Sequence, residues 1–472
     1  MQSERSNYTG RYDSADRDER NDRDVERDHG DRRRHQFRLH WILIMNFFLY
    51  SKCGEGAGIL KRLQDEGNNC SMYIQEKDYS NVYDGILTST DYPEDNDIII
   101  FDSSGNGVKA DSFKKEGFKV FGASSFADKL EDDREFGLEF MLNHGIMIPD
   151  TFKFTSFKEG VNHVKTNKKT KFVFKPSGKN IPCKLTYSSA DMEDMISYMT
   201  FVEKNFGQEI EDFVLQEFLE GAIISSEYWV GKNGFIYGSF NQTIEVKKFM
   251  NDNLGPSTGC SGNIVWPEDE SNSIIAEMLR RVESDLISEN YIGPIDLNTI
   301  VNEEGIYGLE WTPRFGLDAI CSLMQLINQD LGKIIYDSFE EDSEINLLTC
   351  FSGGARLSIP PYPIEPVGKS GLRDTQKNSP NMGIPIRGLE KYEDNCYFYE
   401  IMKKDGQVVH SNGTGVIACI SDVAIDPESC YDLVYQILED CKVPDKQYRT
   451  DLGKTLSKMH EEVKEVLETV WS

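Results

Sequence analysis

The chain has 472 residues, 39% of them hydrophobic and 11% aromatic, so it has enough apolar material for large buried cores. Its formal net charge is −29, and a surface this acidic repels nucleic acid and anionic lipid, so we expect neither as a partner. The sequence has no run of about 20 apolar residues, so no membrane span is expected. The ten cysteines form no C-x-x-C pair, which argues against a zinc site or a disulfide scaffold and favours reduced cytoplasmic thiols.

The first segment of the chain is rich in Arg, Asp and Glu and nearly free of aliphatic residues. Such a segment cannot bury enough apolar surface to offset the entropy lost on ordering. We therefore expect residues 1–44 to be a disordered, charged extension, with an interaction tail as the alternative. A shorter product that begins at Met45 is a further hypothesis.

From residue 41 the pattern changes to apolar strands that alternate with helices. The apolar run 41–50 is followed by a Gly-rich turn and a helical stretch, and two further apolar runs occur at 98–101 and 118–122. Continuous apolar strands between helices are typical of a parallel sheet covered on both faces. The sequence therefore predicts a small doubly wound α/β domain over residues 45–122.

The middle of the chain has strand patterns that are typical of an antiparallel sheet. After a helical stretch, strand patterns occur at 172–175 and 213–218, and two more at 295–301 and 305–312 are joined by Asn302-Glu303-Glu304-Gly305, a good hairpin turn. A third region follows from about residue 346 and ends in an amphipathic helix from about 452.

Acidic and amide side chains lie on both arms of this predicted hairpin. Asp296 and Asn298 share one face of the first strand, and Glu310 and Thr312 share one face of the second, because strand side chains alternate with a period of two. Oxygen ligands that converge from paired strands suit Mg²⁺, which takes one or two carboxylates and keeps several waters. An ordinary polar strand face is the alternative.

A cation and a strand-to-turn segment are candidates for binding a nucleotide. Lys175 ends an apolar strand and faces a Pro-Ser-Gly loop, where a phosphate could sit. The segment 216–221 runs from a strand into a turn, so its backbone could bind an adenine edge while Glu227 reaches ribose hydroxyls. Solvated surface side chains are the alternative for each.

Residues 255–262 form a Gly-rich segment that we expect to be a loop exposing many N–H donors. It includes Ser257, Thr258 and Gly259. Binding of an anion or carboxylate and a plain hairpin connection are equally compatible with this composition.

Several short motifs, in one order, resemble the phosphoribosylamine–glycine ligases of the ATP-grasp superfamily across nearly everything after Met45. The motifs lie at 97–101, 118–122, 130–136, 145–149, 174–176, 217–221, 254–262, 310–316 and 446–453. The resemblance implies an ATP-grasp fold of mixed α/β and α+β class. It has an N-terminal doubly wound domain at 45–122, an ATP-grasp domain at 123–345 and a small C-terminal α+β domain at 346–472.

The same resemblance implies a reaction of purine biosynthesis. ATP would phosphorylate the carboxylate of glycine, and the amine of phosphoribosylamine would attack the acyl phosphate to give glycinamide ribonucleotide, ADP and phosphate. The implied cofactors are ATP and Mg²⁺ (or Mn²⁺), and the partners are small molecules. We expect a cytoplasmic monomer or weak homo-oligomer.

The resemblance also implies residue roles. Lys175 and Arg314 would be catalytic, and Asp296, Glu310 and Thr312 would hold the metal. The residues implied to bind ATP are Arg134, Lys175, Gln216, Glu217, Phe218, Leu219, Glu227 and Lys247. Those implied to bind the amino acid or the amine are Gly54, Gly56, Gly58, Ser257, Thr258, Gly259 and Arg314.

The sequence departs from the family's pattern at several places, which include residues 245–248 and 316–319. Arg134 stands where the family has Lys, Thr312 where it has Asn, and residues 179–183 replace the family's phosphate-covering loop. The alternatives are therefore an ATP-grasp ligase with another amino acid and amine, or a nucleotide-binding homologue without catalysis.

Overall fold

The computed structural model describes residues 44–95, 97–167, 169, 171–177, 185–340, 343–364 and 381–471. The chain divides into two compact units, Met1–Ile44 and Met45–Ser472, and every helix and strand of the described residues lies in the second. The predicted extension, apart from Ile44, and the segment 179–183 lie outside the described residues. Among the helices described, none is long and apolar enough to cross a membrane.

The N-terminal part is a five-stranded sheet in the order β3-β2-β1-β4-β5, with every neighbouring pair parallel. Its strands are β1 (Asn46–Ser51), β2 (Asn69–Ile74), β3 (Thr88–Ser89), β4 (Ile98–Phe101) and β5 (Lys119–Phe121). Phe47 packs in one core with residues of α2 (Ala57–Asp65), whereas Phe48 packs in another with residues of α3 (Gly107–Glu116). Helices thus cover both faces, which confirms the predicted doubly wound sheet.

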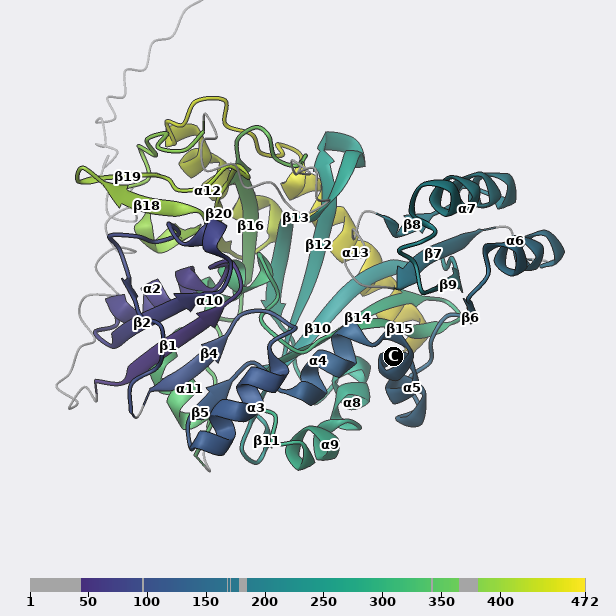
Figure 1. The fold of residues 1–472 in the computed structure, drawn as a ribbon, viewed down its shortest axis with the longest axis horizontal. Coiled ribbons are helices and arrows are strands. Elements are labelled where there is room, and N and C mark those ends of the chain that lie inside the picture. The colour runs from purple at the N-terminus through teal and green to yellow at the C-terminus, as the bar shows by residue number, and fades with distance from the viewer. Residues whose placement is uncertain are drawn as a thin grey trace, which may run out of the picture. The chain divides into compact units, whose positions relative to one another are not determined.

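A second, four-stranded sheet has the order β6-β9-β7-β8. Its elements are β6 (Thr151–Phe154), α6 (Phe157–Thr166), β7 (Phe172–Ser177), β8 (Tyr187–Ser188), α7 (Met192–Phe206) and β9 (Asp212–Glu217). Phe174 and Phe213 of this sheet share a separate core with Met195 and Met199 of α7. Figure 1 shows this sheet with α6 and α7 on the side away from the N-terminal sheet.

The central sheet has nine strands within the described residues, with a main path β15-β14-β10-β12-β13-β16-β20-β17 and β11 beside β10. Its strands are β10 (Ala222–Gly231), β11 (Gly234–Phe235), β12 (Asn241–Met250), β13 (Leu254–Pro267), β14 (Gly293–Asn302), β15 (Gly305–Thr312), β16 (Phe351–Ser358), β17 (Cys396–Phe398) and β20 (Val416–Ala424). The predicted boundary at residue 345 falls inside this sheet, because β13 pairs with β16.

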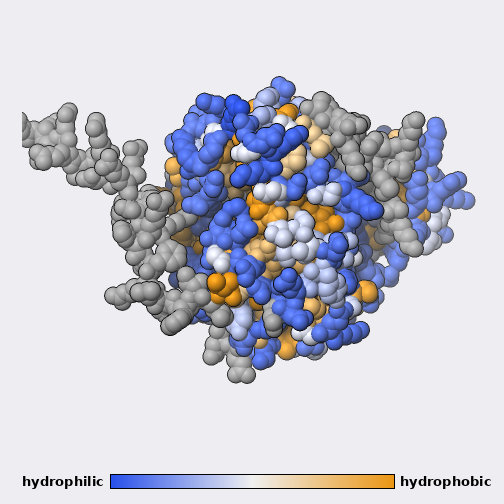
Figure 2. Space-filling model, turned by 60° about the vertical axis from the view of Figure 1, so that its left-hand side comes forward, coloured by the Kyte–Doolittle hydropathy of each residue, from blue (hydrophilic) through white to orange (hydrophobic). Residues whose placement is uncertain are grey.

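Helices and a small hairpin surround the central sheet. They are α4 (Ser125–Asp132), α5 (Arg134–Asn143), α8 (Ile274–Arg280), α9 (Glu283–Ser288), α10 (Ala319–Leu326), α11 (Leu331–Asp337), β18 (Ile401–Lys404), β19 (Gln407–His410), α12 (Pro427–Asp440) and α13 (Leu452–Trp471). The helix α13 confirms the predicted terminal helix. On the face drawn in Figure 2, hydrophilic residues predominate and apolar residues gather near the centre.

The two predicted features of the central sheet have different outcomes. The hairpin is confirmed, because β14 and β15 pair antiparallel from Asn302–Gly305 to Asp296–Thr312. The expected loop at 255–262 is wrong, since those residues lie in β13, and the turn before them is the short 3₁₀ segment Asn251–Asn253. The glycines and serines of this segment extend a strand arm because its partner β12 supplies the backbone hydrogen bonds.

Candidate nucleotide and metal site

Polar side chains meet on one face of three neighbouring strands of the central sheet. Asp296 of β14 lies opposite Glu227 of β10 on one side and Thr312 of β15 on the other, and Asn298 lies opposite Glu310. The Asn298 amide nitrogen donates hydrogen bonds to Asp296 Oδ1 at 2.8 Å and to Thr312 Oγ1 at 3.4 Å. The predicted alignment of Asp296 and Asn298 against Glu310 and Thr312 is therefore present.

A break in the register directs the acidic side chain of β15. Asn298 pairs with Glu310, but the next residue of β14 pairs with Gly308, so Leu309 is an extra residue on β15. A β-bulge of this kind re-aims the side chains beside it. Glu310 is exposed, whereas Asp296 is buried, so the carboxylates extend from the sheet interior to the surface.

Burial and neighbouring charges perturb the carboxyl groups of this site. The pKa of Asp296 is raised well above its ordinary value by burial, and then by the charges of Glu227, Glu245 and Glu310, while Lys247 opposes the shift. Burial also raises the pKa of Glu245, with Lys247 again opposing. Four carboxyl groups in one place favour a bound cation, which would lower their pKa values.

Glu227 lies among these carboxyl groups. Burial raises its pKa to about 7, although the indole N–H of Trp229 donates to it at 2.9 Å and the amide of Asn241 at 3.2 Å. It is only 8% exposed and faces Asp296. The carboxyl group of Glu227 is enclosed within the acidic cluster, and its predicted contact with a ribose stays a prediction.

Three cations converge on the open end of the cluster. Burial, together with the charges of Arg134 and Lys247, lowers the pKa of Lys175 to about 8, while the charge of Glu310 opposes the shift. No described residue forms a hydrogen bond or an ion pair with the Lys175 ammonium. The region around the predicted metal ligand Glu310 therefore also holds the predicted phosphate-binding cations Arg134, Lys175 and Lys247. Because these cations repel one another, their arrangement favours binding of a polyanion.

The predicted adenine-binding segment at the end of β9 uses much of its hydrogen-bonding capacity internally. The backbone N–H of Glu217 donates to the backbone carbonyl of Asp150 at 2.8 Å, and the N–H of Phe218 donates to the backbone carbonyl of Lys171 at 3.3 Å. The carboxylate of Glu217 forms an ion pair with Lys169.

Gln216 and Leu219 of this segment differ in their hydrogen bonding. The side-chain amide of Gln216 is buried and donates to Thr151 Oγ1 at 3.1 Å. Within the described residues, the Leu219 N–H has no partner. The backbone groups of this segment that could bind an adenine edge are therefore the N–H of Leu219 and the neighbouring carbonyl groups.

The guanidinium of Arg314 is already neutralised by a carboxylate. Its Nε and Nη2 atoms donate to Glu131 Oε1 at 3.0 and 2.8 Å, and Nη1 donates to the carbonyl of Phe315 at 2.9 Å. The second oxygen of Glu131 is buried without a hydrogen-bond partner in the described structure. Glu131 was not among the predicted site residues, because only the packing of α4 against β15 brings it to Arg314.

A cavity of about 40 Å³ lies between α4, α5 and β15. Its lining includes Glu131, Arg134, Glu310 and Trp311. It therefore connects the carboxylate bound to Arg314 with the open end of the acidic cluster.

The glycine turn after β1 is closely packed by protein groups. Gly54, Gly56 and Gly58 are all buried. The N–H of Gly54 donates to Ser51 Oγ at 2.7 Å, and the N–H of Gly56 donates to Asp102 Oδ2 at 2.6 Å.

An aromatic ring covers the remaining glycine of this turn. A Cβ atom on Gly58 would lie 2.6 Å from the ring of Tyr397, whose hydroxyl donates to the carbonyl of Glu55 at 2.7 Å. The N–H groups of Gly54 and Gly56 are thus bonded to protein groups in this structure, and the phosphate-binding role of Gly54, Gly56 and Gly58 stays a prediction.

The predicted contacts at 257–259 lie on the arm formed by β12 and β13. Ser257 and Gly259 are exposed, and Thr258 Oγ1 donates to the carbonyl of Lys247 at 2.8 Å. These residues therefore lie beside a cation of the site.

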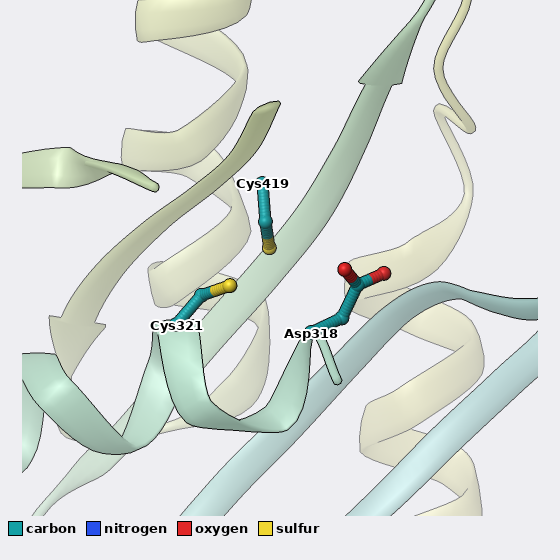
Figure 3. Close-up of side chains that lie close together, drawn as sticks. All are labelled: Asp318, Cys321 and Cys419. Atoms are coloured by element: carbon teal, nitrogen blue, oxygen red, sulfur yellow. The ribbon is translucent and has the colours of Figure 1, made fainter. Parts of the chain in front are cut away.

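A separate buried cluster joins Asp318, Cys321 and Cys419, whose potential ligand atoms lie within 4.8 Å of one another (Figure 3). Asp318 is already bonded to Arg356 at 2.7 and 2.8 Å and to the hydroxyl of Tyr399. The pKa of Cys419 is raised well above its ordinary value by its hydrogen bond with Cys321 and by burial. Neutral thiols beside a paired carboxylate pack as structural groups.

Comparison with known proteins identifies the framework of the site. Residues 132–319 match the family "Phosphoribosylglycinamide synthetase, ATP-grasp (A) domain". A phosphoribosylamine–glycine ligase of Lactococcus lactis is 24% identical over 357 residues, covering 74% of this chain and 81% of that protein. One from Streptococcus pneumoniae is 23% identical over 354 residues, covering 73% of this chain and 80% of that protein. The chain is therefore similar to phosphoribosylamine–glycine ligases over about three quarters of its length, and residues 132–319 match the ATP-grasp domain of that family.

Solved structures agree with the fold of this family. The phosphoribosylamine–glycine ligase of Thermotoga maritima has a TM-score of 0.65 at 18% identity, covering 86% of this chain and 99% of that one. N5-carboxyaminoimidazole synthetase of Staphylococcus aureus, complexed with ADP, has a TM-score of 0.53 at 11% identity, covering 84% of this chain and 98% of that one. The predicted ATP-grasp fold is confirmed.

The region that matches the ATP-grasp domain of the family holds most of the candidate site. Lys175, Lys247, Asp296 and Glu310 all lie within residues 132–319. The filled glycine turn lies before this region.

Proposed function

We propose that this protein is an ATP-dependent ligase that joins a carboxylate to an amine. The observation that carries the proposal is the placing of Lys175, Arg134 and Lys247 around Glu310, directly beside the buried carboxyl group of Asp296. Cations neutralise a triphosphate, and carboxylates hold the divalent ion between its phosphates. An ordinary polar strand face, the alternative left open by the sequence, would not gather three cations.

The residues present fit Mg²⁺ or Mn²⁺ with ATP. Asp296 and Glu310 offer carboxylate oxygens, and Thr312 and Asn298 offer neutral oxygens, which are the ligand types that these ions take. The ion supplies charge neutralisation during phosphoryl transfer. Lys175, as an ammonium with no other partner among the described residues, would hold phosphate oxygens.

The reaction that the relatives' names indicate is the first candidate. The glycine carboxylate takes the terminal phosphoryl group of ATP, and ADP leaves. The amine of phosphoribosylamine then attacks the acyl carbon, the carbon–oxygen bond to phosphate breaks, and the amine loses a proton. No covalent enzyme nucleophile is needed, and purine biosynthesis is the setting. Another amino acid and amine, or an inactive homologue, are the alternatives.

The test is release of ADP from Mg-ATP with candidate amino acids, with and without phosphoribosylamine. Hydroxylamine serves as a general acceptor, because it traps an acyl phosphate whatever the natural amine is. We expect glycine-dependent ADP release in the presence of an acceptor. Binding of ATP without turnover, for any amino acid and any acceptor, would support the inactive homologue and overturn the proposal.

A further inference from the structure

Glu131 holds the guanidinium of Arg314 along one edge. A guanidinium carries five N–H donors in a rigid plane. The Nε and Nη2 groups of Arg314, which share one edge of this plane, both donate to Glu131 Oε1, and Nη1 donates to the carbonyl of Phe315. One N–H on Nη1 and one on Nη2 therefore remain, and neither has a partner among the described residues.

The remaining N–H groups belong to the two terminal nitrogens of Arg314. Terminal nitrogens of arginine bind the two oxygens of a carboxylate or a phosphoryl group with paired hydrogen bonds. The charge of Glu310 acts on Arg314, and Glu131 and Glu310 line the same cavity between α4, α5 and β15. Arg314 thus lies beside the proposed position of the metal and of the transferred phosphoryl group.

The backbone on both sides of Arg314 is fixed by packing. The carbonyl of Pro313 accepts a hydrogen bond from the hydroxyl of Tyr291 at 2.8 Å. Phe315 is 1% exposed, and its ring lies 5.7 Å from that of Phe121, measured between centroids. The long side chain of Arg314 is therefore the part that could still move, and Glu131 fixes the end of it.

Glu131 is itself held in place by α4. It lies in the last turn of this helix, beside Leu130, which is 2% exposed in the core. The side chains of Arg314 and Glu131 are 21% and 19% exposed. An ion pair this enclosed gains little stability, because the loss of water costs about as much as the attraction returns. Stability alone therefore does not account for the pair.

We propose that Glu131 is a positioning residue of this ligase. By holding the Nε edge of Arg314, it leaves the terminal N–H groups available to two oxygens of the anionic substrate group, the amino-acid carboxylate and then the acyl phosphate formed from it. The inference rests on the proposed function, and Glu131 itself touches no substrate. Its contribution is a guanidinium that is oriented before the substrate arrives.

A matched pair of variants separates positioning from stability. Glu131→Gln and Glu66→Gln each remove a carboxylate that is paired with an arginine, at nearly the same side-chain exposure of 19% and 17%. Glu66 bonds to Arg62 and to the N–H groups of Leu331 and Gly332, which are not residues of the candidate site. ADP release with Mg-ATP, hydroxylamine and the amino acid that supports turnover gives kcat and KM, and thermal unfolding gives the stability.

The two variants should differ in kinetics and not in stability. We expect Glu131→Gln to lower kcat/KM for the amino acid at least about tenfold, with KM for Mg-ATP changed by less than about twofold. Glu66→Gln should keep wild-type kinetics although it unfolds at a lower temperature. Wild-type kinetics in Glu131→Gln, or an equal loss in both variants, would overturn the inference. A wild type without turnover would overturn the proposed function, and the inference with it.

A second measurement tests whether Glu131 acts through Arg314. Arg314→Lys keeps the positive charge but has no edge of paired N–H groups. In this background we expect Glu131→Gln to lower kcat by less than about twofold, since no guanidinium remains to be held. ADP formation is followed by chromatography for several hours, so that slow variants are measured. A loss of the same size in both backgrounds would show that Glu131 acts independently of Arg314, and would overturn the inference.

Discussion

The carboxyl groups of Asp296 and Glu227 lie directly opposite each other on the antiparallel strands β14 and β10, and both residues are less than 10% exposed, at 7% and 8%. Burial raises the pKa of Asp296 well above its ordinary value, and the charge of Glu227 raises it further, since like charges in a buried place repel. A divalent cation would relieve this repulsion by its charge. This pair is the physical reason to expect a metal at the sheet.

The first prediction concerns the stability of this pair. Asp296→Asn removes one of the repelling carboxyl groups and keeps the shape of the side chain. We expect the variant to unfold roughly 1–3 °C higher than the wild type in EDTA, and to lose the stabilisation by Mg²⁺ that the wild type gains. Thermal unfolding with and without Mg²⁺ measures both. Equal stabilisation of the two proteins by Mg²⁺ would remove Asp296 from the metal site.

The second prediction concerns turnover at the open end of the site. Glu310→Gln keeps the size of the side chain but removes a charge that would hold the metal during phosphoryl transfer. We expect kcat for ADP release to fall at least about 100-fold, with the free energy of unfolding changed by less than about 1 kcal/mol because Glu310 is exposed.

A matched control lies in the same hairpin. Glu303 is exposed in the turn between β14 and β15, and Glu303→Gln changes the charge of the chain by the same amount. We expect its kcat to equal that of the wild type. The assignment of Glu310 fails if both variants turn over at wild-type rates.

The third prediction concerns the pH dependence of ATP binding through Lys175. Burial, aided by Arg134 and Lys247, lowers the pKa of Lys175 to about 8, so its ammonium is charged below that pH and loses its proton above it. ATP favours the charged form, and its affinity should therefore fall as pH rises above about 8. Lys175→Arg keeps its charge at these pH values, and its affinity should change less. Binding titrations at pH 7 and pH 9 measure the effect, and identical losses in both proteins would contradict it.

The fourth prediction concerns a buried histidine outside the site. Burial lowers the pKa of His410 to about 4, and its Nδ1 accepts a hydrogen bond from the Asn412 N–H at 3.1 Å. The neutral form is favoured in the folded state, so stability is complete above about pH 6.5 and is lost as pH falls towards 4. At pH 5 the loss amounts to about 2 kcal/mol.

The variant His410→Asn isolates this contribution, since its side-chain oxygen can still accept the Asn412 N–H bond. Urea unfolding at pH 7.5 and pH 5 should give a smaller loss of stability for the variant than for the wild type. The assignment fails if the two proteins lose the same free energy of unfolding.

Local sequence patterns determined much of the fold. The apolar runs of β1, β4 and β5 predicted a parallel sheet, because strands buried on both faces must be apolar throughout. The alternation along β14 and β15, with the turn residues Asn302–Gly305, predicted the hairpin and placed Asp296 and Glu310 on one face. The strand assignments and the shared face of Asp296 and Glu310 follow from the alternation of side chains along a strand, which can be seen directly in the sequence.

Only the tertiary structure decided what fills each candidate site. The sequence does not reveal that Asp102, 46 residues after Gly56, occupies the glycine turn, or that Glu131 pairs with Arg314 across 183 residues. Nor does it reveal that Glu227 faces Asp296, since that depends on the register of β10 against β14. A glycine turn binds an anion only if no carboxylate of the protein already holds its N–H groups, and long-range packing alone settles that competition.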